Sequence, residues 1–152
     1  MNKVLLLSGP NLNLLGTREP SVYGTDTLET HVERVTARAA LSGLALDHLQ
    51  SNHEGVLIDA IHAARGEYAA IIINAGAFTH TSWALHDALT IFEGVKVEVH
   101  LSNPAAREPF RHTSVLAPVV DGSIAGFGRR SYDLAVDAVV QLLDVGEGEA
   151  PK

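Results

Sequence analysis

The chain has 152 residues, of which 46% are hydrophobic, and its formal net charge is -7 at pH 7. This length fits one domain with a sizeable core, so we expect residues 1–152 to form a single domain. No apolar run approaches the roughly 20 residues of a membrane-spanning helix, and residues 1–7 lack the cleavage site of an export signal. The negative charge argues against a nucleic-acid partner, because binding to a phosphate backbone depends on clustered lysine and arginine.

The residue types also limit the cofactors. The chain has no cysteine, which excludes disulfides, thiolate nucleophiles and cysteine-ligated metal sites and favours a cytoplasmic location. Its eight histidines form neither an H-x-H nor an H-E-x-x-H pattern. No P-loop or G-x-G-x-x-G motif follows the first apolar run. We therefore expect no metal, no nucleotide and no other cofactor.

Short apolar runs alternate along the chain with segments of helical periodicity, which predicts a doubly wound parallel α/β fold. The first run, 4–7, predicts a buried strand, and a stretch rich in glycine, proline and asparagine follows it. A helix is expected over 27–41, with Asp26 or Thr27 as its N-cap. The run at 69–73 is apolar throughout, which predicts a strand buried on both faces. The remaining elements are expected as strands at 44–49, 96–101 and 123–127, helices after Glu54, at 83–91 and at 131–143, and a frayed polar tail at 146–152.

Polar residues and glycines gather where each predicted strand ends. In chain order they are residues 8–11, residues 51–53, Asn74, His100 with Ser102, and Gly126 with Gly128. Because ligands of doubly wound sheets bind outside the carboxyl ends of the strands, one pocket shared by all five ends is the simplest prediction. The alternative is that these loops are polar only because they cap helices and satisfy backbone groups.

The loop after the first predicted strand carries two residues suited to chemistry. Gly16 and Gly24 bracket Arg18 and Tyr23, a layout that suits a lid closing over a substrate. A tyrosine hydroxyl keeps its proton at neutral pH, and a neighbouring guanidinium favours the phenolate that could act as a base. The alternative is a disordered loop anchored by one aromatic ring.

Glu98 and His100 are two residues apart in a predicted strand, so their side chains share one face. A carboxylate beside an imidazole can orient it and favour its protonated form, which makes His100 a candidate general acid. Ser102 and its neighbouring amides could then hold a carboxylate. A purely structural Glu and His pair is the alternative.

Two further groups of residues suit an oxygenated anion. Asn74 and His80, in the connection after the third strand, could hydrogen-bond a polyol or could serve only as turn and capping residues. A local positive site inside an acidic protein suits a small anionic ligand, although surface charges alone would give the same pattern. The arginines that could form this site are Arg107, Arg111, Arg129 and Arg130.

Taken together, five segments resemble one family, the type II 3-dehydroquinate dehydratases, also called type II dehydroquinases. The segments run in family order and are GPNLNLLGTREP at 9–20 followed by YG at 23–24, QSNHEG at 50–55, INAGAFTHTS at 73–82, EVHLSN at 98–103 and REPFR at 107–111. The resemblance implies a flavodoxin-like fold, a five-stranded parallel sheet in the order 2-1-3-4-5. It implies one catalytic domain, a hydro-lyase that converts 3-dehydroquinate to 3-dehydroshikimate through an enolate without metal or Schiff base. That reaction is the third step of the shikimate pathway towards chorismate and the aromatic amino acids.

The resemblance also implies residue roles. Tyr23 would be the base that removes the C2 proton, Arg18 would stabilise its anionic form, and Asn11 would help hold a water at the enolate oxygen. His100, supported by Glu98, would protonate the departing C1 hydroxyl. Substrate-binding roles fall, by the same resemblance, on Asn74, His80, Leu101, Ser102 and Arg111. Asp87 would reach the site of a neighbouring subunit in a homododecamer, a tetramer of trimers.

Two positions depart from the family pattern, and three other functions stay open. His86 stands where the family often has arginine, and residues 104–106 stand where it usually has a histidine or another bulky residue. The same reaction also serves quinate breakdown. A non-catalytic flavodoxin-like module could bind the small anion without converting it, and a flavin or nucleotide protein could share the architecture.

Overall fold

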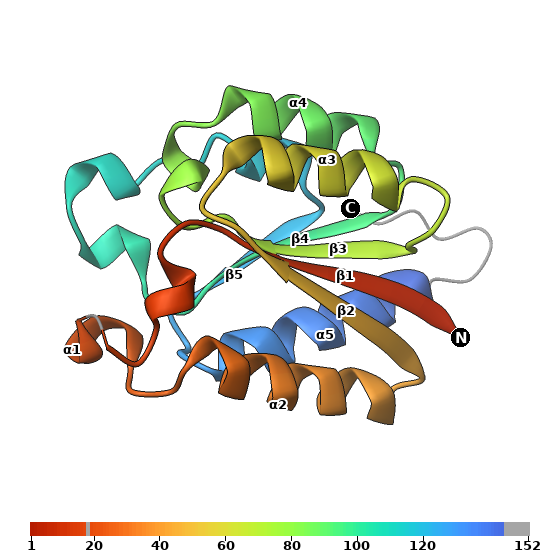
Figure 1. The fold of residues 1–152 in the computed structure, drawn as a ribbon, viewed down its shortest axis with the longest axis horizontal. Coiled ribbons are helices and arrows are strands. Elements are labelled where there is room, and N and C mark those ends of the chain that lie inside the picture. Colours follow the sequence, from red (N-terminus) through yellow and green to blue (C-terminus); the bar gives the residue numbers. More distant parts are fainter. Residues whose placement is uncertain (18, 145–152) are drawn as a thin grey trace.

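A computed structural model describes residues 1–17 and 19–144 and shows one sheet of five parallel strands (Figure 1). The strands are β1 (Asn2–Ser8), β2 (Leu44–Gln50), β3 (Ala70–Asn74), β4 (Val95–His100) and β5 (Gly122–Ala125). Their order in the sheet is β2-β1-β3-β4-β5. This is the flavodoxin-like order, so the predicted fold class is confirmed.

Helices cover both faces of the sheet, as parallel strands require, because each crossover connection places its helix on one face. In Figure 1, α3 (Glu54–Ala64) and α4 (Trp83–Ile91) lie above the sheet, and α2 (Leu28–Leu41) and α5 (Arg130–Leu143) lie below it. The short elements are α1 (Pro20–Tyr23) and the 3-10 turns η1 (Leu12–Leu14), η2 (Gly76–His80), η3 (Pro104–Ala106), η4 (Pro109–Arg111) and η5 (Ala117–Val119). The predicted tail at 146–152 lies outside the described residues.

The centre of the sheet is apolar on both faces. Every residue of β3 is buried, as its uninterrupted apolar sequence predicted. Because side chains alternate along a strand, Ile72 packs toward α2 and α5 while Ile73 packs toward α3 and α4. Burial of each such side chain contributes about 1.5–3 kcal/mol. The central strands are therefore a rigid support for whatever follows their carboxyl ends.

Most element boundaries follow their sequence signals. Thr27 is the N-cap of α2, where its hydroxyl accepts a bond from the Thr30 amide at 3.2 Å. Helix α4 spans Trp83–Ile91, the predicted range, and Ser82 caps it by accepting from the Leu85 amide at 3.0 Å. Strand β5 ends at Ala125, two residues before the predicted end, because Gly126 adopts a φ of 95° that turns the chain out of the sheet.

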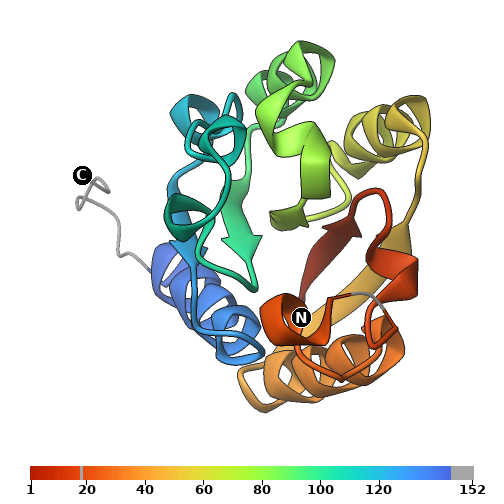
Figure 2. The same cartoon turned by 90° about the vertical axis from the view of Figure 1, so that its left-hand side faces the viewer.

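The carboxyl ends of the central strands lie side by side, at the end of the molecule that Figure 2 faces. The last residue of β1, Ser8, pairs with the last residue of β3, Asn74. The next amide, that of Gly9, donates to the Asn74 carbonyl at 2.8 Å. A Cβ at Gly9 would lie only 2.2 Å from the Ala75 carbonyl oxygen. The segments after β1 and β3 therefore leave the sheet in contact, and only glycine permits that contact.

Gly9→Ala is expected to lower the free energy of unfolding by about 1–3 kcal/mol, because the methyl group forces the two segments apart. Denaturation in urea measures the loss. Gly122→Ala is the matched control, since a Cβ there meets no atom within 4 Å. If the two variants have the same free energy of unfolding, the close contact between the segments after β1 and β3 does not require glycine at position 9.

One histidine is buried between the helices below the sheet. His31 on α2 is 4% exposed, and its ring lies 5.6 Å from the ring of Tyr132 on α5. Its Nε2 atom has no hydrogen-bond partner. Burial lowers the pKa of His31 below its ordinary 6.5, because the apolar surroundings penalise the imidazolium.

Acid should therefore destabilise the fold through His31. Above about pH 7 the imidazole is neutral in both states; as the pH falls below the ordinary histidine value, the unfolded chain binds the proton first and unfolding becomes more favourable. His31→Phe keeps an aromatic ring against Tyr132 and should reduce the stability lost between about pH 7.5 and 5.5 by about 1 kcal/mol. His62→Gln on the exposed surface of α3 is the control. Identical pH slopes for wild type and His31→Phe would contradict the argument.

Candidate functional site

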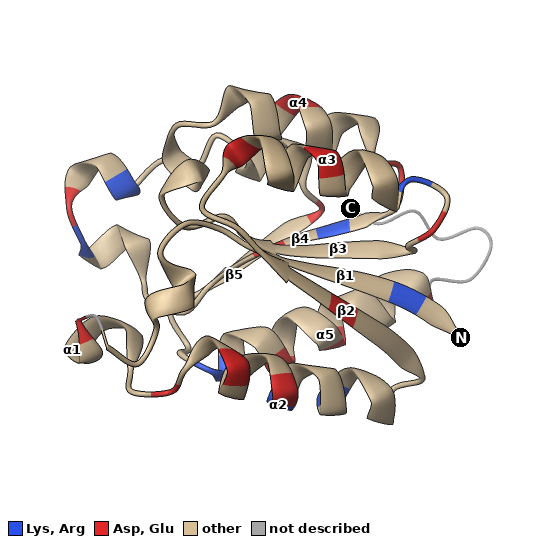
Figure 3. Cartoon of the chain, in the orientation of Figure 1, with Lys and Arg blue, Asp and Glu red and all other residues tan. Residues whose placement is uncertain are grey.

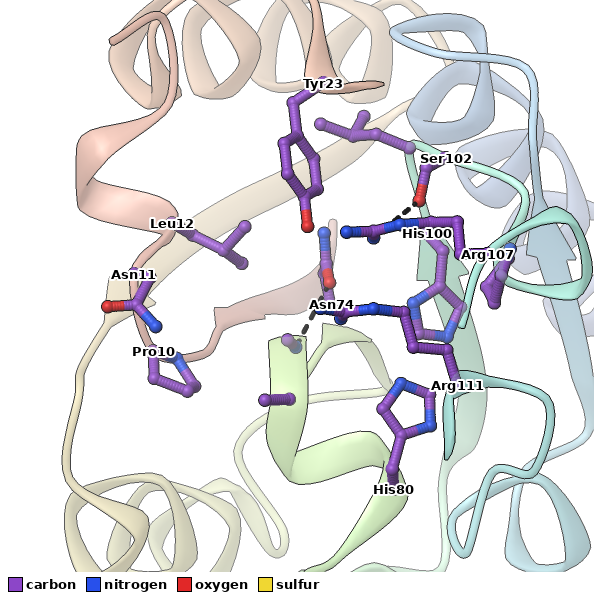
Figure 4. Close-up of a pocket in the computed structure, with 14 residues that line it drawn as sticks. Pro10, Asn11, Leu12, Tyr23, Asn74, His80, His100, Ser102, Arg107 and Arg111 are labelled. Atoms are coloured by element: carbon purple, nitrogen blue, oxygen red, sulfur yellow. Dashed lines mark hydrogen bonds between the residues drawn. The ribbon is translucent and has the colours of Figure 1, made fainter. Parts of the chain in front are cut away.

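A pocket of about 150 Å³ opens at the carboxyl end of the sheet (Figure 4). It lies beside the junction of β1 and β3, which is the switch point of a sheet with this strand order. Its lining combines amides, imidazoles, guanidinium groups and one phenol. The lining residues are Pro10, Asn11, Leu12, Tyr23, Asn74, Gly76, Ala77, His80, His100, Leu101, Ser102, Pro104, Arg107 and Arg111.

Three strand ends supply the pocket, together with α1 and the segment that holds η3 and η4. Among the described residues that follow β2 and β5, neither 51–53 nor Gly126 and Gly128 line it. The prediction of a pocket shared by all five ends is therefore wrong for the two edge strands, β2 and β5. Their loops support the lining from behind: Asn52 accepts from the Asn11 amide at 3.0 Å, and the Gly128 amide donates to the Leu101 carbonyl at 2.9 Å.

Glu98 and His100 form the buried acid–imidazole pair that their spacing on β4 predicted. The His100 Nε2 lies 2.5 Å from Glu98 Oε2, and the Glu98 side chain is 3% exposed. The second carboxylate oxygen, Oε1, accepts from the Ser114 hydroxyl at 2.8 Å. His100 lines the pocket, and since Nε2 is engaged by the carboxylate, Nδ1 is the nitrogen left for a ligand.

Tyr23 is placed by α1 so that its hydroxyl points into the pocket, toward Asn74 and Arg107 (Figure 4). The Arg107 guanidinium lies over the Tyr23 ring, 5.0 Å from its centroid. Its Nη2 is 3.7 Å from Glu19 Oε2 at the start of α1, and its Nη1 donates to the Ser102 hydroxyl at 3.3 Å. Arg18, the guanidinium expected beside Tyr23, lies outside the described residues.

A second arginine and a histidine form the side of the pocket nearest η4. The Arg111 guanidinium lies 4.5 Å from the centroid of the Phe110 ring, and its Nε donates to Glu108 Oε2 at 3.1 Å. This bond lowers the pKa of the Glu108 carboxyl below its usual value. His80 Nδ1 is 2.8 Å from the Thr113 carbonyl oxygen. A carbonyl only accepts, so Nδ1 of His80 carries a proton.

Asn74 forms the floor of the pocket at the end of β3. The side chain is 5% exposed, and its Oδ1 accepts from the Gly76 amide at 3.3 Å. Its Nδ2 approaches the hydroxyl of Tyr132 on α5 at 3.5 Å. Burial raises the pKa of Tyr132 above the usual 10.0, so this hydroxyl remains neutral and polar beneath the pocket. Asn74, a predicted substrate-binding residue, therefore lines the pocket and is held by its contacts with Gly76 and Tyr132.

The remaining predicted residues divide between the pocket and the outer surface. Asn11, Leu101 and Ser102 line the pocket. Asn11 adopts a left-handed φ of 68° at the start of η1. Asp87 does not line it: on α4 its side chain is 83% exposed, with Oδ1 3.2 Å from His86 Nδ1.

Arg107 is a pocket residue that the sequence indicated only as one of four arginines that could form a positive site. The cluster of late arginines indicated it, but only Arg107 and Arg111 line the pocket, whereas Arg129 and Arg130 at the start of α5 do not. Figure 3 shows the charged residues on the segment with η3 and η4. The contact between Arg107 and the Tyr23 ring joins residues far apart in the chain, so no local spacing could have predicted it.

Two other structural features are absent from residues 1–17 and 19–144. No group of three His, Cys, Asp or Glu among them could hold a metal ion. In the same part of the chain, no helix is both long and apolar enough to cross a membrane.

The family model described as "Dehydroquinase class II" matches residues 2–140. The chain belongs to the class II dehydroquinase family. It is 58% identical over 143 residues to a 3-dehydroquinate dehydratase of Ruegeria pomeroyi, a match that covers 94% of this chain and 96% of that relative. The expected family is confirmed.

Solved structures of the family have the same fold. A type II dehydroquinase from Butyrivibrio crossotus is 42% identical with a TM-score of 0.88, over 91% of this chain and 97% of that one. A type II dehydroquinase from Propionibacterium acnes is 38% identical with a TM-score of 0.90, over 93% of this chain and 97% of that one. The flavodoxin-like fold is thereby confirmed, while the roles of individual residues stay predictions.

Proposed function

We propose that this chain removes water from 3-dehydroquinate to give 3-dehydroshikimate, the third step of the shikimate pathway. Membership of the dehydroquinase family supports the reaction. One geometric observation supports the mechanism: Tyr23 and His100, a phenol and an imidazole from opposite halves of the sequence, line the same pocket. Quinate breakdown uses the same reaction, but the comparisons with known proteins do not favour that alternative.

In the proposed reaction the Tyr23 phenolate takes the hydrogen from C2, and the electron pair of the broken C–H bond forms an enolate with the C3 carbonyl. The enolate electrons then form the C1–C2 double bond and expel the C1 hydroxyl. That hydroxyl takes a proton from His100 and leaves as water. Glu98 holds the imidazole by its Nε2, which leaves Nδ1 as the proton donor. Asn11 positions a water that donates to the enolate oxygen.

The proposed base needs a cation beside it, because a positive charge favours the phenolate over the phenol. The sequence assigned this role to Arg18, and that role stays a proposal. Arg107 is a second candidate, since its guanidinium lies 5.0 Å from the centre of the Tyr23 ring and its side chain is 14% exposed. A largely desolvated guanidinium interacts more strongly with a phenolate than one in water.

The other polar lining residues match the oxygen atoms of the substrate. We assign the ring hydroxyls to Asn74, His80 and Arg111, and the carboxylate to the Leu101 amide and the Ser102 hydroxyl. The two pocket arginines also favour an anion. Asn74 Nδ2, His80 Nε2 and the Arg111 guanidinium supply the hydrogen-bonding groups that a polyol requires.

Assembly and location belong to the same proposal. The exposed Asp87 carboxylate would complete the site of a neighbouring subunit in a homododecamer, which explains why it is outside the pocket of its own chain. Residues 1–152 would form one catalytic domain, and a cytoplasmic location stays a prediction.

The reaction is tested by mixing the protein with 3-dehydroquinate and following the ultraviolet absorbance of the conjugated product. Turnover should survive a chelator and borohydride, which would stop a metal-dependent or Schiff-base route. Absence of turnover by the folded, assembled protein would refute the proposal. Ligand-induced thermal stabilisation without product would instead identify a non-catalytic binding module.

Tyr23→Phe should reduce kcat by about 10²- to 10⁴-fold, the usual contribution of a general base, while substrate binding changes little. Tyr68→Phe is the matched control. The Tyr68 hydroxyl lies at the other end of the sheet and donates to Asp47 at 2.6 Å, an interaction that raises its pKa to about 12. Steady-state kinetics separate the two variants, and near-normal turnover by Tyr23→Phe would refute the assigned base.

A further inference from the structure

One short segment outside the pocket contacts the His80 imidazole directly and is linked to the His100 imidazole through Glu98. This segment, residues 113–115, is named the brace here and lies between η4 and η5. The Thr113 carbonyl accepts from His80 Nδ1 at 2.8 Å, and the Ser114 hydroxyl donates to Glu98, the partner of His100. The Val115 amide donates to the Thr79 carbonyl at 2.8 Å, which ties the brace to η2.

The hydroxyl proton of Ser114 has only one direction available. The Ser114 oxygen accepts from the Leu116 amide at 3.1 Å and from the Ala117 amide at 3.0 Å. A serine hydroxyl has one proton and two lone pairs, so both lone pairs are occupied. The proton is left to point at Glu98 Oε1, 2.8 Å away.

This donation determines the state of Glu98. A hydrogen bond that is donated to a carboxylate favours its charged form, and Glu98 is 2% exposed, so water does little to stabilise that charge. A neutral Glu98 could not carry its proton on Oε1 without displacing the Ser114 proton, so its proton would lie on Oε2, where it is the one shared with His100 Nε2. Because the Ser114 bond favours the charged carboxylate, this shared proton is expected on the imidazole.

We propose that Ser114 is a positioning residue that keeps Glu98 ionised and so keeps a proton on His100 Nε2, which leaves Nδ1 to carry the proton that the imidazolium donates to the substrate. Ser114 does not line the pocket and acts only through Glu98. The consequence for turnover rests on the proposed dehydratase function. The consequence for the imidazole does not, because it is a property of the protein without substrate.

Three substitutions vary the hydrogen bond that Ser114 donates without adding a charge. Ser114→Thr keeps both donor and acceptor. Ser114→Cys keeps the size of the side chain, but its thiol is only a weak donor and a weak acceptor. Ser114→Ala has neither. Thr113→Ala is the matched control on the neighbouring residue, since the bond from Thr113 to His80 uses the backbone carbonyl.

The first measurement is the ¹⁵N NMR spectrum of the two pocket imidazoles without substrate. In wild type, Thr113→Ala and Ser114→Thr, the His100 signals should report a protonated Nε2. In Ser114→Ala and Ser114→Cys, the His100 signals should move while those of His80 stay in place. Unchanged His100 signals in both of these variants would overturn the proposal, whatever the activity of the protein.

The second measurement is steady-state turnover of 3-dehydroquinate. Loss of the donor should lower kcat by about 10-fold or more, the effect of losing a hydrogen bond to a charged group, with KM changed less than about two-fold. Ser114→Thr should restore the rate. If Ser114→Ala unfolds, Ser114→Cys carries the test, and wild-type kcat in a folded Ser114→Cys overturns the proposal. Failure of wild type to turn over would refute the proposed function and leave the NMR result to decide the role of Ser114.

Discussion

The parallel alignment of the three central strands is the constraint on which the rest of the structure depends. Strands β1, β3 and β4 are adjacent and run in one direction, so the residues that follow them leave the sheet at the same edge. Gly9 permits the closest approach, with its amide 2.8 Å from the Asn74 carbonyl. Asn11, Asn74 and His100 come from these three strand ends and reach one pocket. Apolar burial on both faces of β3 holds the arrangement rigid.

The buried pair of Glu98 and His100 is polar and lies beside the apolar core, so its atoms need hydrogen-bond partners. A charged carboxylate that is 2% exposed is costly unless its oxygens accept hydrogen bonds. His100 satisfies Oε2 and Ser114 satisfies Oε1, so the cost is offset on both sides. The same bonds fix the orientation of an imidazole that lines the pocket. Stability and the proposed chemistry therefore depend on the same contacts at the end of β4.

The sequence predicted the features that depend on neighbouring residues. The apolar run of β3, the Thr27 and Ser82 caps and the pairing of Glu98 with His100 are all local, and all are present. What it missed depends on contacts between distant segments. The prediction was wrong at the edge strands because the sequence alone does not show which of the five strand ends supply residues that line the pocket. The contacts of Arg107 with the Tyr23 ring and of Ser114 with Glu98 follow only from the folded chain.

Tyr23 and His100 are assigned separate roles on one substrate, the first as base and the second as acid. Hydrogen exchange at C2 tests this assignment most directly. In D2O, a His100→Gln variant should exchange the C2 hydrogen of 3-dehydroquinate for deuterium without releasing water, because Tyr23 still forms the enolate and nothing protonates the leaving hydroxyl. A Tyr23→Phe variant should show neither exchange nor dehydration. Proton NMR follows both processes in one sample. Exchange that persists in Tyr23→Phe, or dehydration at the wild-type rate in His100→Gln, would contradict the account.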